Sequence, residues 1–366
     1  MSWKERFRHL IGVKPERVKI GQVYVGTGEP VFVIAEAGIN HNGDIELAKK
    51  LVDVAVEAGA NAIKFQKRTT SEILTKEGLD KPYNSPNAFA PTYGEHREKL
   101  EFGVNQYQIL KSYAQEKGIL FFASAWDPVS ADLLEELGVD AYKIPSADTI
   151  NLDLLEHIAK KGKPVMLSTG MNTESEIDAA VETVLTHNNR VIIFHCVSLY
   201  PCPDDKIDLR FMDVLREKYA PLPVGYSGHE TTLDPTLTAV ARGAVIVERH
   251  LTLDKTMRGS DHAASLDPKE FTELVLRIRN IEKILGRKEK VIVDELKPLR
   301  EKLAKSLVTR CVVRKGTVIT AEMLGVKGPG IGIEPYRKHD VIGRVAQQDF
   351  DADVLLPKDA LHWPTF

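Results

Sequence analysis

Cysteine is scarce in this chain of 366 residues, which contains only Cys196, Cys202 and Cys311. Three cysteines cannot build the dense disulfide framework of a small secreted domain, and their spacing matches neither a zinc knuckle nor a CxxC redox pair. The sequence also lacks any run of about 18 consecutive apolar residues, and its start, MSWKERFRHLIGV, has no apolar stretch of signal-peptide length. These absences predict a protein of a reducing compartment, the cytoplasm, with no membrane-spanning segment.

An excess of charge of either sign is missing as well. Lys and Arg together number 49, and Asp and Glu number 52, so the net charge is -3. Such a balance gives no general attraction to nucleic acid or to acidic membranes, and we expect neither as a partner. An anionic ligand must therefore be held by a local cluster of cations.

Short apolar, β-branched runs alternate with longer amphipathic stretches from Val31 onward. Eight runs have the pattern of strands: 31–36, 62–66, 119–124, 141–145, 165–168, 191–196, 224–226 and 245–250. Helix start signals lie between them: Asp44, Asp127 with Pro128, Thr173 with Glu176, Asp234 with Pro235, and Asp267 with Pro268 and Glu270. Eight strand–helix units in about 250 residues predict the α/β class and a (β/α)8 TIM barrel. The competing open doubly wound sheet usually has a GxGxxG turn after its first strand, and none occurs here.

Composition divides the chain into four parts. We expect an N-terminal extension (1–30), the barrel (31–286), a charged linker (287–305) and a small β-rich unit (306–366) with strand-like runs at 308–313, 318–320 and 341–345. A unit of about 60 residues without disulfides is only marginally stable alone, so it should pack on a barrel, its own or a partner's. The polar excursion 68–103 is too long for an ordinary connection and predicts a functional loop.

Polar residues gather where the predicted strands end, and in a barrel these ends meet on the face that holds the active site. They are Glu36, Lys64, Gln66, Ser124, Lys143, Ser146, Ser168, Ser198, Ser227, His229 and His250. Any one of them alone fits a solvated strand end, but their recurrence on one face favours a site. Glu36 and Asp148 both follow strands and are candidate acid–base carboxylates.

His229 and His250 end adjacent predicted strands, which places two imidazoles close together, as a divalent metal with N and O ligands requires. Two core histidines fit the same spacing equally well. Two His ligands leave coordination positions open, so such a metal would bind substrate as a Lewis acid. Lys64 and Lys143 can flank a phosphate or carboxylate. The alternative is a pair of lysines that snorkel to the barrel rim.

Three further groups of charges have simpler explanations. The tract at 95–99 fits a solvated charge run better than a site. The run at 160–163 fits cations at a helix C-terminus, where the helix dipole favours them. Lys67 and Arg68, just beyond the second strand, fit a distal phosphate and ordinary surface charges equally well.

Seven segments together resemble the sialic acid synthase family, whose members condense phosphoenolpyruvate with an N-acylhexosamine. The segments are IAEAGINHNGD (34–44), AIKFQ (62–66), YKIPSADT (142–149), MLSTGMN (166–172), GYSGHE (225–230), ERHLTLDKT (248–256) and GSDHAASLDP (259–268). The end of the chain resembles the antifreeze-like (SAF) domain of this family. TYGEH (92–96) and LEF (100–102) are most similar to the animal-type branch.

The resemblance implies a transferase that makes N-acetylneuraminate, or its 9-phosphate, from N-acetylmannosamine or its 6-phosphate. It implies that His229 and His250 hold a divalent metal, typically Mn²⁺, with Mg²⁺ or Co²⁺ as alternatives. Phosphoenolpyruvate binding is implied for Lys64, Ser124, Lys143, Ser146, Ser168, Ser198 and Ser227. The positions of Glu36, Gln66, Tyr200 and Asp261 match those implicated in sugar binding and acid–base steps.

The resemblance also implies a domain-swapped homodimer in which the SAF domain covers the neighbouring subunit's site. The family's tail often carries an arginine that reaches the sugar, but this chain reads VKGPG, with Gly328 at that place and Lys327 or Arg337 as candidate replacements. Three other functions stay open. They are a legionaminate-type synthase on a related N-acylhexosamine, a metal-dependent sugar isomerase or aldolase, and a non-catalytic sugar-binding protein.

Overall fold

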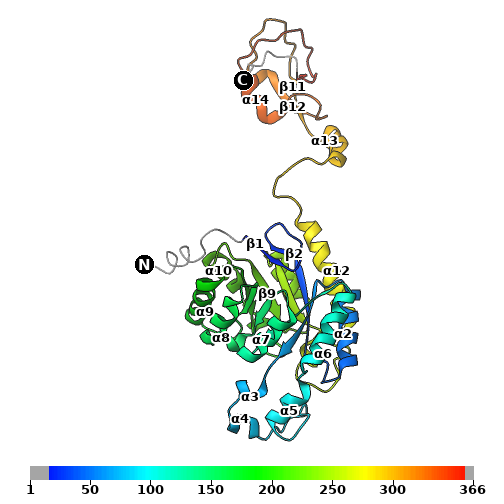
Figure 1. The fold of residues 1–366 in the computed structure, drawn as a ribbon. Helices are drawn as coiled ribbons and strands as arrows, with labels where there is room; N and C mark the ends of the chain where they lie inside the picture. Colours follow the sequence, from blue (N-terminus) through cyan, green and yellow to red (C-terminus); the bar gives the residue numbers. More distant parts are fainter. Residues whose placement is uncertain (1–15, 359–366) are drawn as a thin grey trace. The chain divides into compact units, whose positions relative to one another are not determined.

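The chain folds into two compact units, Met1–Gly286 and Arg287–Phe366 (Figure 1). The structure, a computed structural model, describes residues 16–358. The first half of the predicted N-terminal extension and the last residues of the predicted tail, 1–15 and 359–366, lie outside the described residues. Among residues 16–358, every helix is too short or too polar to cross a membrane.

Eight parallel strands close into a barrel in the first unit. They are β3 (Phe32–Gly38), β4 (Ala62–Lys67), β5 (Leu120–Ala125), β6 (Tyr142–Ile144), β7 (Val165–Ser168), β8 (Val191–Cys196), β9 (Val224–Gly228) and β10 (Ile246–His250). The barrel closes because β10 pairs with β3, which leaves no free sheet edge. The predicted α/β barrel is confirmed, and each predicted strand lies within one or two residues of its observed bounds.

Helices follow the strands around the barrel. They are α2 (Ile45–Glu57), α6 (Val104–Glu116), α7 (Pro128–Leu137), α8 (Leu152–Lys160), α9 (Glu174–His187), α10 (Arg210–Lys218), α11 (Asp234–Ala241) and α12 (Pro268–Leu285). Asp44, Asp127, Thr173 and Asp267 cap their helices as predicted, because each side chain accepts hydrogen bonds from first-turn N–H groups. The prediction for Asp234 is wrong, since Asp234 is already the first residue of α11 and makes no capping bond.

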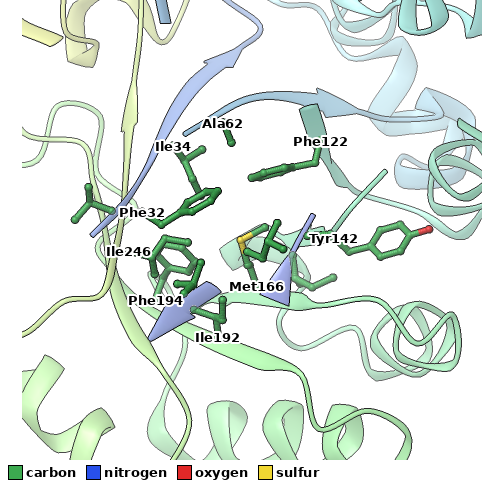
Figure 2. Packing of buried hydrophobic residues seen from close by; sticks show 14 of the residues in the cluster. Phe32, Ile34, Ala62, Phe122, Tyr142, Met166, Ile192, Phe194 and Ile246 are labelled. Atoms are coloured by element: carbon green, nitrogen blue, oxygen red, sulfur yellow. The ribbon is translucent and has the colours of Figure 1, made fainter. Parts of the chain in front are cut away.

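Apolar side chains fill the interior of the barrel. Figure 2 shows Ile34, Ala62, Phe122, Met166 and Phe194, which come from five different strands and gather in this interior. All five are buried, and complete burial of a side chain such as Ile or Phe contributes about 1.5–3 kcal/mol. Successive strand side chains alternate between the two faces of a sheet, so the next inward position lies two residues further along each strand. At those positions the side chains become polar.

Two additions to the barrel unit differ from a simple eight-fold repeat. Residues of the predicted N-terminal extension form an antiparallel hairpin, β1 (Arg17–Ile20) and β2 (Val23–Gly26), whose Val18, Ile20 and Val25 join the barrel core. The predicted functional loop 68–103 is largely helical, with α3 (Thr70–Ile73), α4 (Lys76–Asp80) and α5 (Tyr93–Leu100). Short 3-10 helices occupy three later loops: η1 (Ser146–Asp148), η2 (Asp204–Lys206) and η3 (His262–Ala264).

The second unit has its own small core. Its elements are η4 (Asp294–Leu296), α13 (Lys297–Leu303), β11 (Ser306–Thr309), η5 (Ala321–Met323), β12 (Leu324–Lys327), η6 (Pro335–Arg337) and α14 (Lys338–Val341). The predicted strand at 341–345 is wrong, since Val341 ends α14 and only Val345 makes an isolated bridge, to Val318. Residues 287–305, predicted as a linker, belong to this unit, where the Glu301 carbonyl accepts a hydrogen bond from Gly330 N–H.

Candidate active site

A cavity of about 230 Å³ lies at the carboxyl ends of the barrel strands. It is lined by every residue that the sequence predicted for the site except Asp148: Glu36, Lys64, Gln66, Ser124, Lys143, Ser146, Ser168, Ser198, Tyr200, Ser227, His229, His250 and Asp261. The barrel brings these residues together because its parallel strands end on the same face. Glu36, for example, pairs with His250 on one neighbouring strand and with Lys64 on the other.

Two lysines lie deep in this cavity rather than at its rim. Lys64 is 2% exposed and Lys143 is 3% exposed, which excludes the alternative of snorkelling side chains. The Lys64 ammonium donates to Ser124 Oγ at 2.9 Å, and the Lys143 ammonium donates to Ser168 Oγ at 2.6 Å. The two ammonium groups and the adjacent hydroxyls form a buried set of donors that suits an anionic substrate.

Two buried carboxylates balance these lysines. Lys64 Nζ lies 2.8 Å from Glu36 Oε2 and 3.6 Å from Glu248 Oε1, and Lys143 Nζ lies 3.5 Å from Glu248 Oε1. Burial raises the pKa of Glu36 to about 7, against the opposing effect of Lys64. Burial also raises the pKa of Glu248, but Lys143 and Lys64 outweigh it and hold this pKa well below its usual range. Glu36 is therefore able to exchange a proton near neutral pH, whereas Glu248 stays ionised.

Glu248 is a site residue that the sequence analysis missed. It follows Ile246 and precedes His250 by two residues on β10, so all three side chains share the inward face of the strand. The signal was therefore present in the sequence as the alternation from Ile246 to Glu248 to His250.

His229 and His250 lie side by side, with ring centroids 5.4 Å apart. A carbonyl oxygen only accepts, so the 2.7 Å contact of His229 Nδ1 with Val197 O requires Nδ1 to donate and leaves Nε2 with a free lone pair. His250 Nδ1 is buried without a hydrogen-bond partner among residues 16–358 and lies 3.8 Å from Asp261 Oδ2. Burial lowers the pKa of both histidines, which favours the neutral form that binds metals.

The donor set at this histidine pair fits a divalent cation. Within the described part of the chain, no group of three or more His, Cys, Asp or Glu side chains is arranged to hold a metal. The pair would supply two imidazole nitrogens, and water and substrate would complete the coordination. The ring of Tyr200 packs 4.0 Å from that of His229 and 5.7 Å from that of His250, and so forms the adjoining wall.

Asp148 is not brought to the cavity, although it was predicted as an acid–base residue. It lies in η1, where its neighbours Ser146 and Ala147 line the cavity instead, and its Oδ1 accepts a weak hydrogen bond from Asn151 at 3.5 Å. Burial raises its pKa to about 6. Because Asp148 does not line the cavity, the geometry assigns it no contact with a substrate there.

The tract at 95–99 differs from the predicted solvated charge run. Glu95, Glu98 and Lys99 are exposed, but His96 is buried and Arg97 lines the cavity. The difference arises because α5 is anchored on the barrel at 100–102, which turns one face of this short helix toward the strand ends. A helix of only eight residues is too short for a periodic signal that would identify this face.

The fold and this cavity define a class of protein: a (β/α)8-barrel enzyme whose strand ends present buried cations, hydroxyls and a pair of histidines to an anionic substrate. The chain belongs to the NeuB family, which matches residues 51–290, and it carries a C-terminal SAF domain at 304–362. The resemblance to sialic acid synthases drawn from the sequence motifs is thereby confirmed.

Several named synthases are similar to this chain over most of its length. N-acetylneuraminate-9-phosphate synthase of Homo sapiens is 40% identical over 322 residues, which cover 88% of this chain and 90% of the human protein. N,N'-diacetyllegionaminic acid synthase of Legionella pneumophila is 36% identical, with 95% and 97% covered. The structure of N-acetylneuraminic acid synthetase from Leptospira borgpetersenii, in complex with citrate, superposes with a TM-score of 0.69 at 37% identity, covering 77% of this chain and 94% of that one. The chain is accordingly an enzyme of the synthase type.

Proposed function

We propose that this enzyme condenses phosphoenolpyruvate with the open-chain form of an N-acylhexosamine, with N-acetylmannosamine or its 6-phosphate as the sugar. The products are N-acetylneuraminate, or its 9-phosphate, and inorganic phosphate. The observation that carries the proposal is that one cavity holds two separate groups of binding residues. Strands β4 to β7 supply two lysines and two serines that suit phosphoenolpyruvate, and the ends of β9 and β10 supply the histidine pair.

Phosphoenolpyruvate carries a phosphate and a carboxylate, so it needs several donors and cations. Lys64 and Lys143 supply two ammonium groups, and the hydroxyls of Ser124 and Ser168 accept hydrogen bonds from them. Glu248 stays ionised between the two lysines, 3.6 Å from Lys64 Nζ and 3.5 Å from Lys143 Nζ. Ser146, Ser198 and Ser227 add neutral donors around the same space.

The reaction joins C3 of phosphoenolpyruvate to the aldehyde carbon of the sugar. A divalent metal held by His229 and His250, for which we propose Mn²⁺ with Mg²⁺ and Co²⁺ as alternatives, would supply Lewis-acid polarisation of the aldehyde oxygen. Attack leaves a cation at C2 of the former phosphoenolpyruvate, to which water adds before phosphate departs by cleavage of the C–O bond. Glu36, with its raised pKa, takes the proton of that water.

Residues around the histidine pair hold the sugar in this proposal. Gln66 donates a hydrogen bond to Glu36 Oε1 at 2.8 Å and so positions the base. Gln66 also lines the cavity. Tyr200 and Asp261 line the cavity next to the histidines. A sugar bound by its aldehyde end near the histidines would therefore meet an aromatic face, a carboxylate and an amide.

Purified protein incubated with phosphoenolpyruvate, Mn²⁺ and each sugar tests the proposal. We expect equal amounts of phosphate and of a 2-keto acid, measured by colorimetric assay and mass spectrometry. Absence of both products with both sugars would contradict it. An isomerase or aldolase would consume sugar without phosphoenolpyruvate, and a binding protein would retain the sugar unchanged.

A legionaminate-type reaction is the second candidate, because the Legionella relative is named as such a synthase. It differs only in the sugar, a related N-acylhexosamine. The same assay with that sugar decides between the two candidates by the ratio of their kcat/KM values.

We further propose a cytoplasmic homodimer in which the SAF domain covers the cavity of the neighbouring subunit. The second unit exposes apolar side chains that such contact would bury: Val326 is 50% exposed, Ile331 59% and Tyr336 81%. The candidate replacements for the missing arginine at Gly328 already have carboxylate partners, since Lys327 pairs with Asp353 and Arg337 with Asp340. A solution mass of one chain, by light scattering, would contradict the dimer.

A further inference from the structure

One end of the cavity carries an arginine without an acidic partner. Arg97, on α5, lines the cavity, and its Nε donates to Tyr93 Oη at 2.9 Å while its guanidinium stacks 4.9 Å from the ring of Tyr93. Among residues 16–358, no carboxylate lies within ion-pair distance of Arg97. A guanidinium held by a neutral phenol is oriented but keeps its full charge available to a ligand.

A second arginine lies beside it. Arg68 is 3% exposed, lines the same cavity and stacks 4.2 Å over the ring of Trp126. It shares the single carboxylate of Glu101 with Lys67, at 3.2 Å and 3.4 Å respectively. Burial lowers the pKa of Arg68, and repulsion by the positive charge of Arg97 lowers it further.

The local charge at this end of the cavity is therefore unbalanced. Lys67, Arg68 and Arg97 contribute three positive charges, and the carboxylates of Glu101 and Asp261 offset two of them, which leaves an excess of about one positive charge. Like charges placed together in a partly buried site cost free energy unless an anion joins them. The deeper lysines do not share this excess, because Glu36 and Glu248 already balance them.

Asp261 links this arginine pair to the histidines. Its carboxylate lies 3.8 Å from His250 Nδ1. Arg68, Arg97, Asp261 and the two histidines line the same cavity, which allows one extended sugar to contact both pairs.

We propose that Arg97 and Arg68 form a distal anion subsite, which selects an N-acylhexosamine that bears a phosphoryl group at the end remote from its aldehyde. This inference rests on the proposed function, in which the aldehyde lies at His229 and His250. A phosphoryl group would neutralise the local excess of positive charge, and guanidinium groups bind phosphate oxygens through paired N–H donors. A sugar without an anionic group at that end would give Arg97 no acidic partner, whereas Arg68 would keep its ion pair with Glu101.

The test compares Arg97→Gln with Lys99→Gln, a matched control on the same helix whose side chain is exposed and outside the cavity. Steady-state kinetics are measured on N-acetylmannosamine 6-phosphate and on N-acetylmannosamine at saturating phosphoenolpyruvate and Mn²⁺. We expect wild-type protein to favour the phosphorylated sugar, and Arg97→Gln to lower that preference about 10- to 100-fold, mainly through KM. Lys99→Gln should leave the preference unchanged, and Arg97→Lys should restore part of it.

A binding measurement separates this inference from the proposed function. Calorimetric titration with N-acetylmannosamine 6-phosphate, without phosphoenolpyruvate, should show weaker binding to Arg97→Gln than to the wild type and Lys99→Gln, whether or not turnover is seen. Equal loss on both sugars, an effect on the KM of phosphoenolpyruvate alone, or unchanged binding of the phosphorylated sugar would overturn the subsite. If the wild type does not catalyse condensation, but Arg97→Gln still binds the phosphorylated sugar more weakly than the wild type does, only the proposed reaction is overturned.

Discussion

Arg249 and Glu230 form an ion pair from which solvent is wholly excluded, with Arg249 Nη1 2.9 Å from Glu230 Oε1 and neither side chain exposed. Each is the chain neighbour of a cavity histidine, since Glu230 follows His229 and Arg249 precedes His250. The alternation of strand side chains points Arg249 away from the barrel interior and His250 into it. The ion pair therefore fixes, from behind, the two segments that present the histidine pair.

Replacing Arg249 by Met should destabilise the barrel by about 3–5 kcal/mol, because it leaves the Glu230 carboxylate buried without its cation. Urea unfolding of the full chain, followed by tryptophan fluorescence, measures this change. The double variant Glu230→Gln with Arg249→Met should recover part of the loss, since no buried charge then remains unpaired. Lys160→Met, which breaks an exposed pair with Glu156 on α8, serves as the control and should have no measurable effect. Equal stability of Arg249→Met and wild type would contradict the role of the pair.

Replacing Lys143 by Met should lower kcat/KM for phosphoenolpyruvate by about 100-fold or more, because a buried charge-assisted donor to the substrate is lost. The variant also removes one of the two cations that hold Glu248 ionised. Kinetics with phosphoenolpyruvate as the varied substrate measure the effect, and Lys163→Met is the matched control, because Lys163 is half-buried outside the cavity and pairs with Glu135. A drop confined to the sugar's KM would show that Lys143 has been assigned to the wrong substrate.

Much of the site could be predicted because the parallel strands of a barrel all end on one face, which brings the residues at their ends close together. Once eight strands are counted, residues such as Lys64, Ser124 and His250 must meet at one face. The prediction of eleven of the thirteen cavity residues needed no knowledge of loop structure beyond a few positions after each strand, whereas Tyr200 and Asp261 came from the family resemblance. Strand-borne residues are thus fixed by register, which the sequence encodes in its alternation.

Loop-borne residues are where the sequence failed. Arg97 reaches the cavity through α5, whose placement depends on packing of aromatic side chains such as Tyr83 and Phe89 around His96, and no period in the sequence reports it. Asp148 failed in the opposite direction, because the tight turn of η1 directs Ser146 and Ala147, rather than Asp148, to the cavity. In both cases the direction of a side chain is set by local tertiary packing, not by distance from a strand end.

Removal of divalent metal should abolish condensation. Treatment with a chelator followed by desalting is expected to lower the rate about 100-fold or more, and added Mn²⁺ should restore it. His229→Ala and His250→Ala should show the same loss without restoration and should bind less Mn²⁺ in an equilibrium assay by mass spectrometry. His157→Ala, which alters an exposed histidine paired with Asp132 on α7, is the control and should behave as wild type. Full activity of the chelated protein would refute the proposed metal.

The rate should fall in acid as Glu36 takes up a proton. A base must be ionised to accept the proton of water, and burial raises the pKa of Glu36 to about 7 from an ordinary value of 4.5. The expected profile of kcat/KM therefore has an acid limb near pH 7, with about a tenfold loss per pH unit below it, rather than a limb near pH 4.5. Gln66→Met removes the 2.8 Å hydrogen bond that favours the charged form of Glu36, and so should move this limb to higher pH. Glu36→Gln should lower the rate about 100-fold or more and leave residual activity without the limb. If the acid limb persists in Glu36→Gln, then another group titrates there, and that group rather than Glu36 is the base.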